Sequence, residues 1–327
     1  MMQINRTKKS LLYMEVFTMV LFKGKRMCIV CMMCLCLLLV TYSHIIVANA
    51  ETEGVTPDGL EYEIDWRDEV EIRGYRGTDT QLVIPETIDG CKVTEIGESA
   101  FWGCTDLTSV YFPQSITEIW CCSFTNCSGL TSISIPARVT KIYECTFDGC
   151  TSLSSVEISK GVTEIEKGSF NECKALTVIN VSSNNTEYTS KDGVVFSKDM
   201  TKLILCPAGK SGTYEIPSSV TSIAEGAFWG CEKLTKITVP SSVTNIERRA
   251  FIGCTNLKEI NVLEDNKEYI SKNGILFNKN KTQLIKCPEG KEIMVVKNAI
   301  TRTAYNGLII FLQYQIDPIL KYYTYYK

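Results

Sequence analysis

A 23-residue period is the feature that most constrains what this chain can fold into. Segments of the form V-T-x-I or I-T-x-I begin at Val93, Ile116, Val139 and Val162, each 23 residues after the one before. The same segment returns with the same spacing at Val220 and Val243. A fixed period of this length is typical of repeat architectures, in which each unit stacks on its neighbours. We therefore expect a solenoid.

Each unit carries matched apolar columns. A Phe follows eight residues after the start of each unit, a Cys three residues later and a Leu three residues after that. The Phe column is Phe101, Phe124, Phe147, Phe170, Phe228 and Phe251, and the Cys column is Cys104, Cys127, Cys150, Cys173, Cys231 and Cys254. Each unit closes on an alternating pair such as Ile133 and Ile135, which predicts a strand with apolar side chains inward and Ser, Thr and Lys outward. The V-T-x-I stretch supplies the opposite wall and has too few helix formers for more than a short turn of helix.

One unit cannot be stable alone. Each buried large side chain contributes roughly 1.5–3 kcal/mol, whereas ordering the backbone costs roughly 1–2 kcal/mol per residue. Neighbouring units must therefore stack, with strands about 4.8 Å apart, so that the columns become continuous ladders.

These units resemble the BspA-like class of bacterial leucine-rich repeats, whose motif runs V-T-x-I-x-x-x-A-F-x-x-C-x-x-L-x-x-I-x-I-P. The resemblance covers about residues 60–300, and residues 60–92 are similar to the N-terminal capping turn of that family. It implies a fold of the α/β leucine-rich-repeat type: a β-dominated right-handed solenoid with 23-residue repeats and hairpin insertions. It also implies surface display, and adhesion or host-matrix binding for some members, without identifying a ligand.

The period is interrupted between Val162 and Val220, which are 58 residues apart. Several residues of this stretch recur 81 residues later, so the insertion belongs to a larger repeat; the recurring set begins Tyr188, Gly193 and Phe196 and returns as Tyr269, Gly274 and Phe277. Residues 194–196 and 202–205 read as two strands joined at 197–199, which predicts a hairpin that widens the coil.

The two ends of the chain differ from the repeats. Lys23, Lys25 and Arg26 precede an apolar run over 27–40, and Ala48-Asn49-Ala50 follows, which predicts a signal peptide cleaved after Ala50. An uncleaved membrane anchor over 27–47 is the alternative. After Lys291 the register fails, so that the tail is either an atypical cap or truncated. The predicted organisation is a signal peptide over 1–50, an N-terminal capping region over 51–92, the solenoid over 93–300 and this tail over 301–327.

Composition excludes several kinds of function. The only histidine is His44, inside the predicted leader, so the mature chain can hold neither a Ser-His-Asp triad nor a histidine-containing metal site. No C-x-x-C pair occurs after residue 50, which argues against structural zinc. A net charge of -3 without a basic run argues against nucleic acid as a partner. We expect no enzyme activity, no metal and no cofactor.

The outward strand positions form the candidate binding surface. Small hydroxyl and polar side chains there suit a broad contact with protein or glycan, and a merely solvated face is the alternative. Trp102 and Trp229 both follow the column Phe, at a position that varies between units, which suggests an exposed edge; packing against the neighbouring turn is the alternative. The candidate residues are Tyr111, Ser134, Glu157, Asn180, Thr238, Asn261, Trp102 and Trp229.

Two further groups recur at every turn. The column cysteines are expected to be buried thiols beside Phe and Leu, with disulfides between units as the alternative. Glu95, Glu118 and Glu164 also repeat once per turn and are interpreted as surface residues, because a catalytic carboxylate pair would be unique.

The sequence therefore predicts a secreted or cell-surface protein that binds a partner through its strand face. The expected partner is a host or neighbouring-cell surface or matrix protein, or a glycan, with membrane contact only through an uncleaved leader. A structural spacer and a non-functional fragment of a longer repeat protein are the alternatives.

Overall fold

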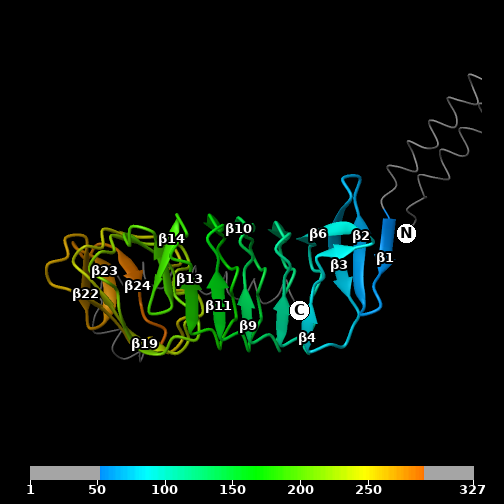
Figure 1. Cartoon of the computed structure of the whole chain (residues 1–327). Helices are drawn as coiled ribbons and strands as arrows, with labels where there is room; N and C mark the ends of the chain where they lie inside the picture. Colours follow the sequence, from blue (N-terminus) through cyan, green and yellow to red (C-terminus); the bar gives the residue numbers. More distant parts are fainter. Residues whose placement is uncertain (1–51, 291–327) are drawn as a thin grey trace, which may run out of the picture. The chain divides into compact units, whose positions relative to one another are not determined.

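A computed structural model describes residues 52–290, which form a coil of short strands (Figure 1). Every regular element in that range is a strand, from β1 to β24. The predicted β-dominated solenoid with a 23-residue spacing is confirmed. The wall opposite the long strands consists of two-residue strands and turns, without the short turn of helix that the sequence allowed. The predicted signal peptide over 1–50 and the tail over 301–327 lie outside the described residues.

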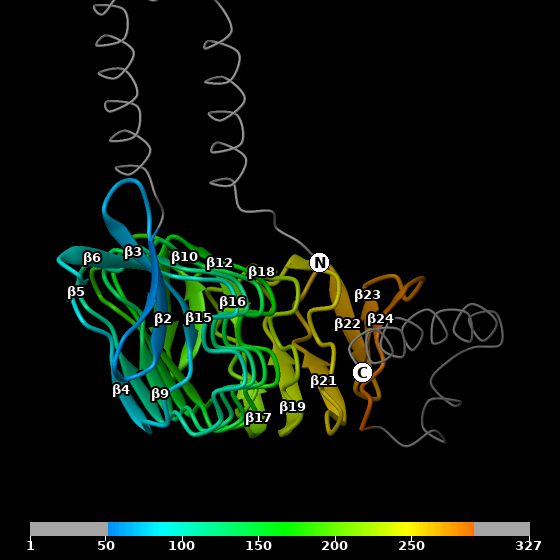
Figure 2. The same ribbon diagram turned by 90° about the vertical axis from the view of Figure 1, so that its right-hand side faces the viewer.

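The described chain starts with an antiparallel meander, whose three strands are β1 (Thr52–Val55), β2 (Leu60–Ile64) and β3 (Glu69–Tyr75). The last of them, β3, pairs in parallel with β6 (Cys91–Ile96), which also forms a hairpin with β5 (Thr87–Ile88). Apolar side chains of β2 and β3 are fully buried against the first turn, and Figure 2 shows this meander in front of the stacked turns. It occupies the position that a cap requires.

Two walls of parallel strands run along the coil. The long-strand wall contains β4 (Gln81–Val83), β7 (Ser109–Tyr111), β9 (Ser132–Ser134), β11 (Ser155–Ile158) and β13 (Val178–Val181), and later β17 (Gly212–Glu215), β19 (Leu234–Val239) and β21 (Glu259–Val262). The short-strand wall contains β8 (Glu118–Ile119), β10 (Lys141–Ile142), β12 (Glu164–Ile165), β18 (Ser222–Ile223) and β20 (Asn245–Ile246). Partners are 23 residues apart, as in the pair Val156 and Ile179, so the register of the sheets follows the repeat.

The Phe column fills the coil between the walls. Phe101, Phe124, Phe147 and Phe170 stack ring on ring, with centroids 4.9, 5.6 and 5.4 Å apart. Phe228 and Phe251 stack in the same way at 5.3 Å. Offset stacking at this distance contributes about 0.5–1.5 kcal/mol per pair beyond area burial. The core is thus a ladder, in which each ring is covered by the turn before and the turn after.

The first insertion contains the predicted hairpin and one strand more. β15 (Val194–Ser197) and β16 (Lys202–Leu205) pair antiparallel as expected, and β14 (Tyr188–Lys191) adds a third strand. The second insertion repeats this unit as β22 (Tyr269–Lys272), β23 (Ile275–Asn278) and β24 (Leu284–Lys286), with the same pairing and a bulge at the same place. Each insertion thus folds as one local unit.

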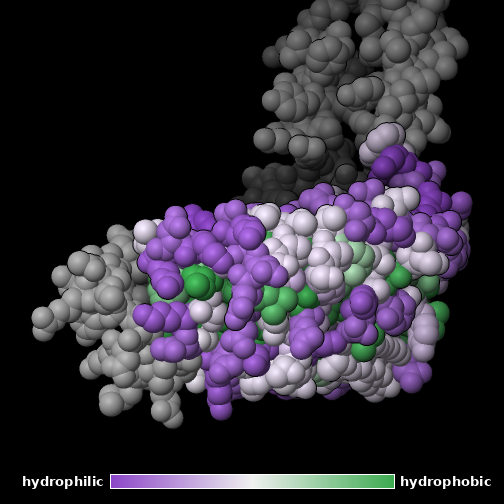
Figure 3. Space-filling view, turned by 90° about the vertical axis from the view of Figure 1, so that its left-hand side faces the viewer, coloured by the Kyte–Doolittle hydropathy of each residue, from purple (hydrophilic) through white to green (hydrophobic). Residues whose placement is uncertain are grey.

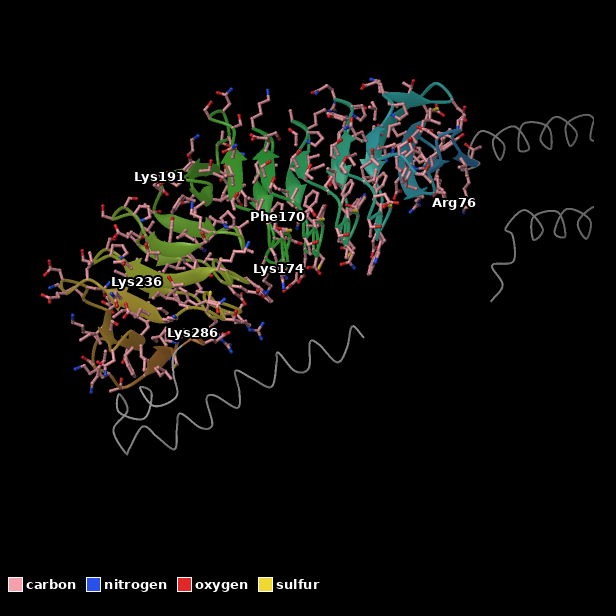
Figure 4. All side chains as sticks on the ribbon, turned by 90° about the horizontal axis from the view of Figure 1, so that it is seen from below. Arg76, Phe170, Lys174, Lys191, Lys236 and Lys286 are labelled. Atoms are coloured by element: carbon pink, nitrogen blue, oxygen red, sulfur yellow. The ribbon has the colours of Figure 1, made fainter. Side chains whose placement is uncertain are left out.

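The first insertion also divides both walls. Among the described strands, β13 has no sheet partner in β17, and β12 has none in β16 or β18. Instead, β16 pairs in parallel with β18 and starts the second short-strand wall. Figure 4 shows the turns before this level, near Phe170, and those after it, near Lys236, stacked at different inclinations. We call this level, residues 182–216, the inserted level.

Candidate functional site

Six of the eight candidate residues lie on one side of the long-strand wall, which we call the strand face: the outward side chains of β4, β7, β9, β11, β13, β19 and β21. Sheet register places Ser134, Glu157 and Asn180 side by side in one row. Tyr111 precedes Ser134 by one repeat, and its own partner in the register is Val83. The strand face therefore presents a continuous row of side chains up to the inserted level.

The row is apolar at its start and polar after it. Val83 is 65% exposed and Tyr111 is 56% exposed, and both are large apolar side chains. Ser134, Glu157 and Asn180 are exposed as well, and the Asn180 amide donates a hydrogen bond of 2.7 Å to Glu157. Exposed apolar side chains that adjoin polar ones are typical of a contact surface. Val83 was not among the residues selected from the sequence, because its strand precedes the first regular unit.

The strand face is polar beyond the inserted level. Thr238 and Asn261 are paired in register and half-buried. Beside them, Lys236 and Glu259 form an ion pair with an N–O distance of 3.4 Å. An exposed pair of this kind contributes up to about 1 kcal/mol. This part of the face offers charge and hydrogen bonding but no apolar anchor.

The two tryptophans lie in turns away from the strand face, and they differ from each other. Trp102 is 53% exposed. Trp229, at the same repeat position, is half-buried and lines a cavity of about 370 Å³ at the inserted level. The expected exposed edge therefore describes Trp102, while packing against a neighbouring turn describes Trp229.

The repeated carboxylates are engaged by the next turn. Trp120 Nε1 donates a hydrogen bond of 3.0 Å to Glu95, and the Tyr143 hydroxyl donates one of 3.2 Å to Glu118. The Trp120 and Tyr143 rings stack with centroids 5.2 Å apart, and burial raises the pKa of Glu118. These contacts tie one turn to the next.

The column cysteines are thiols whose sulfurs have a defined role. Cys127 Sγ donates to the Phe101 carbonyl at 3.0 Å, and Cys150 Sγ donates to the Phe124 carbonyl at 3.1 Å. Cys173 and Cys254 make the same contact with the Phe of the preceding turn. Burial raises the pKa of these thiols well above its ordinary value, which keeps them protonated and able to donate. The interpretation as buried thiols is thus confirmed for these four.

Two searches of residues 52–290 concern metals and membranes. Over that range, no three or more His, Cys, Asp or Glu side chains are grouped so as to hold a metal ion. The same stretch contains no helix that could span a membrane.

Sequence reasoning missed the cavity beside Trp229. Its other polar lining residues include Asn171, Lys202, Glu225 and Glu247. A signal for it was present, because the inserted level has the four residues Cys206-Pro207-Ala208-Gly209 and no A-F-x-x-C loop. That shortening indicates missing volume in the coil, but the charged residues around it come from four different segments.

The repeat geometry agrees with a family model. The model for the BspA type leucine-rich repeat region matches residues 80–198 and 210–305 in six copies. The chain belongs to this family. The resemblance inferred from its repeat motif is thereby confirmed.

Solved leucine-rich-repeat structures are similar to this BspA-type chain. A leucine-rich repeat protein from Eubacterium ventriosum is 21% identical, with a TM-score of 0.43 over 67% of this chain and 74% of that one. A leucine rich cell surface protein from Faecalibacterium prausnitzii is 21% identical, with a TM-score of 0.36 over 65% and 77%. The leucine-rich repeat protein of T. pallidum is 27% identical, with a TM-score of 0.39 over 64% and 78%. No curated protein matches the BspA-type chain.

Proposed function

We propose that this BspA-type protein is exported and binds a protein of a host or neighbouring cell surface, or of the surrounding matrix, through its strand face. The observation that carries the proposal is the row from Val83 and Tyr111 to Asn180. It places exposed apolar side chains beside exposed polar ones on a flat sheet. Apolar anchors surrounded by polar contacts are the usual composition of a protein interface.

The protein acts by binding rather than by catalysis in this proposal. The repeated carboxylates support it, because Glu95 and Glu118 are hydrogen-bonded to side chains of the next turn. The absence of histidine after residue 50 supports it as well. Export is supported by the basic and apolar pattern of residues 23–50, and it predicts a secreted form that begins at Glu51.

The decisive experiment measures binding of the purified chain to immobilised matrix proteins and mucins, with Val83→Ser/Tyr111→Ala as the test variant. Trp102→Ala is the matched control, because Trp102 is similarly exposed but lies off the strand face. We expect saturable binding that the double variant weakens at least tenfold and the control leaves unchanged. Equal binding by wild type and double variant would exclude the strand face. No binding by any folded form would favour the spacer or fragment alternatives.

A further inference from the structure

The cavity at the inserted level exists because one loop of the coil is missing. In regular turns the loop that carries the column Phe is tied to the next turn, as where Phe147 N donates to the Ser169 carbonyl at 2.9 Å. At the inserted level the chain crosses between the walls through residues 206–209. Cys206 N donates to the Ala227 carbonyl and Gly209 N to the Leu176 carbonyl, both at 2.7 Å. This short crossing cannot fill the volume of a whole loop, and a cavity of about 370 Å³ is left beside it.

The cavity has two opposed walls made of equivalent repeat positions. Asn171 stands on one wall, and Trp229 stands on the other at the same position of its own unit. The Trp229 ring lies against Gly226, where a Cβ would be only 3.3 Å from ring atom Cε3. Gly226 has a φ of +68°, so that glycine serves both the turn and the ring. An aromatic surface therefore faces an amide across the cavity.

The charged groups of the lining are paired with one another or with neighbours. Lys202 Nζ lies 2.7 Å from Glu247, and Lys167 Nζ lies 3.6 Å from Glu225. Glu166 is paired with Lys141 outside the cavity at 2.6 Å. The charges nearly cancel, so the cavity offers donors and acceptors without a strong preference for a free anion or cation.

We propose that this junction cavity binds a neutral saccharide of about one or two sugar rings. The apolar C–H face of a sugar ring packs on an aromatic surface such as Trp229, while its hydroxyl groups both donate and accept. Asn171, Lys202, Glu225 and Glu247 supply the complementary groups. The cavity volume falls in the range of roughly 300–1,000 Å³ that is typical of small-molecule sites. The site lies off the strand face and goes beyond the function proposed above.

The test is a titration of the full-length protein with neutral mono- and disaccharides, followed by calorimetry and by saturation-transfer NMR. The probes are glucose, galactose, mannose, N-acetylglucosamine, lactose and cellobiose. We expect at least one of them to bind, and Trp229→Ala to weaken it roughly three- to tenfold, as the loss of one aromatic contact implies. Trp102→Ala is the matched control, since it removes the same residue type at the same repeat position. It should leave sugar binding unchanged.

Asn171→Ala guards against a folding defect in the Trp229 variant, because it removes a polar group from the opposite wall. A loss of sugar binding in this variant, with an unchanged thermal unfolding midpoint, supports the proposal. Mucin before and after removal of its glycans then distinguishes glycoprotein-borne sugars from free ones. The proposal is overturned if none of the six sugars binds, or if Trp229→Ala binds as well as wild type. Val83→Ser/Tyr111→Ala should bind sugar normally, so that failure of the strand face and failure of the cavity can be told apart.

Discussion

The regular turns, residues 93–176, and the inserted level belong to the same coil but satisfy their backbone polar groups in different ways. In the regular turns, successive backbones pair directly, as where Phe124 N donates to the Thr146 carbonyl at 2.9 Å. At the inserted level one buried side chain, Asn185, replaces such contacts. Its amide donates to the Ser159 and Val162 carbonyls at 2.9 and 2.8 Å and accepts from the backbone of Glu187 and Tyr188.

The second insertion repeats the same solution. Asn266 is fully buried, donates to the Pro240 and Val243 carbonyls at 2.9 Å and accepts from Glu268 N and Tyr269 N. A ladder thus spreads stability over many similar contacts, whereas each insertion depends on one side chain. The contrast predicts different responses to substitution in the two regions.

The largest effect is expected in the Phe column. Phe147 is fully buried and stacks on a ring on both sides, whereas Phe170, beside the inserted level, stacks on one side only. We expect Phe147→Ala to lower the free energy of unfolding by about 3–5 kcal/mol, and Phe170→Ala by about 1 kcal/mol less. Urea unfolding measures both variants. Equal losses would show that the ladder is not interrupted at the inserted level.

The next effect concerns the buried asparagines. Asn185→Ala removes four hydrogen bonds and leaves buried carbonyl groups without that donor, so we expect a loss of about 2–4 kcal/mol. Asn180→Ala is the control, because its exposed amide bonds only to Glu157 among the described residues, and it should cost less than about 0.5 kcal/mol. A small loss for Asn185→Ala, measured by the same unfolding method, would mean that water replaces the amide.

The repeat could be predicted from the sequence because it is a pattern of columns. Phe, Cys and Leu recur at fixed spacing, and side chains at fixed spacing in a coil must meet. The hairpin of the first insertion was predictable for a similar reason, since its strands are local and apolar. β14 was missed because Tyr188-Thr189-Ser190-Lys191 is polar and shows no alternation of apolar residues.

The candidate site was predictable only in part. Strand alternation correctly placed Tyr111, Ser134, Glu157 and Asn180 on the outer side of the sheet. It could not show that Trp102 and Trp229 differ, because both occupy one repeat position and only the neighbouring turn distinguishes them. Asn185 was also missed, since nothing local indicates that this amide reaches carbonyls 23 and 26 residues earlier.

A smaller effect tests the thiol ladder of the regular turns. Cys150→Ser keeps a donor for the Phe124 carbonyl but places a hydroxyl among Phe and Leu side chains, so we expect a loss of about 1–2 kcal/mol. Cys145→Ser, at a half-buried position outside the column, is the control and should cost less than about 0.5 kcal/mol. Thermal unfolding of both variants under reducing conditions checks the difference. A larger loss at Cys145 would contradict the ladder.

The smallest effect depends on pH and comes from Asp148, which holds in its turn the position that Asn171 holds beside the cavity. Burial, and then the charge of Glu172, raise the pKa of Asp148 to about 6. Since the folded state then binds a proton that the unfolded state has lost, the free energy of unfolding falls as pH rises from about 4 to about 6.

Asp148→Asn should therefore stabilise the protein at pH 7 by about 1 kcal/mol, after allowance for the solvent that still reaches the carboxyl group, and should have no effect near pH 4. Urea unfolding at both pH values tests this, with the exposed Asp106→Asn as the control. A gain that is the same at both pH values would mean that the amide improves packing and that the aspartate charge is not the cause. A gain confined to pH 7 would show that a regular turn bears the cost of a buried charge, a cost that Asn171 avoids in the turn beside the cavity.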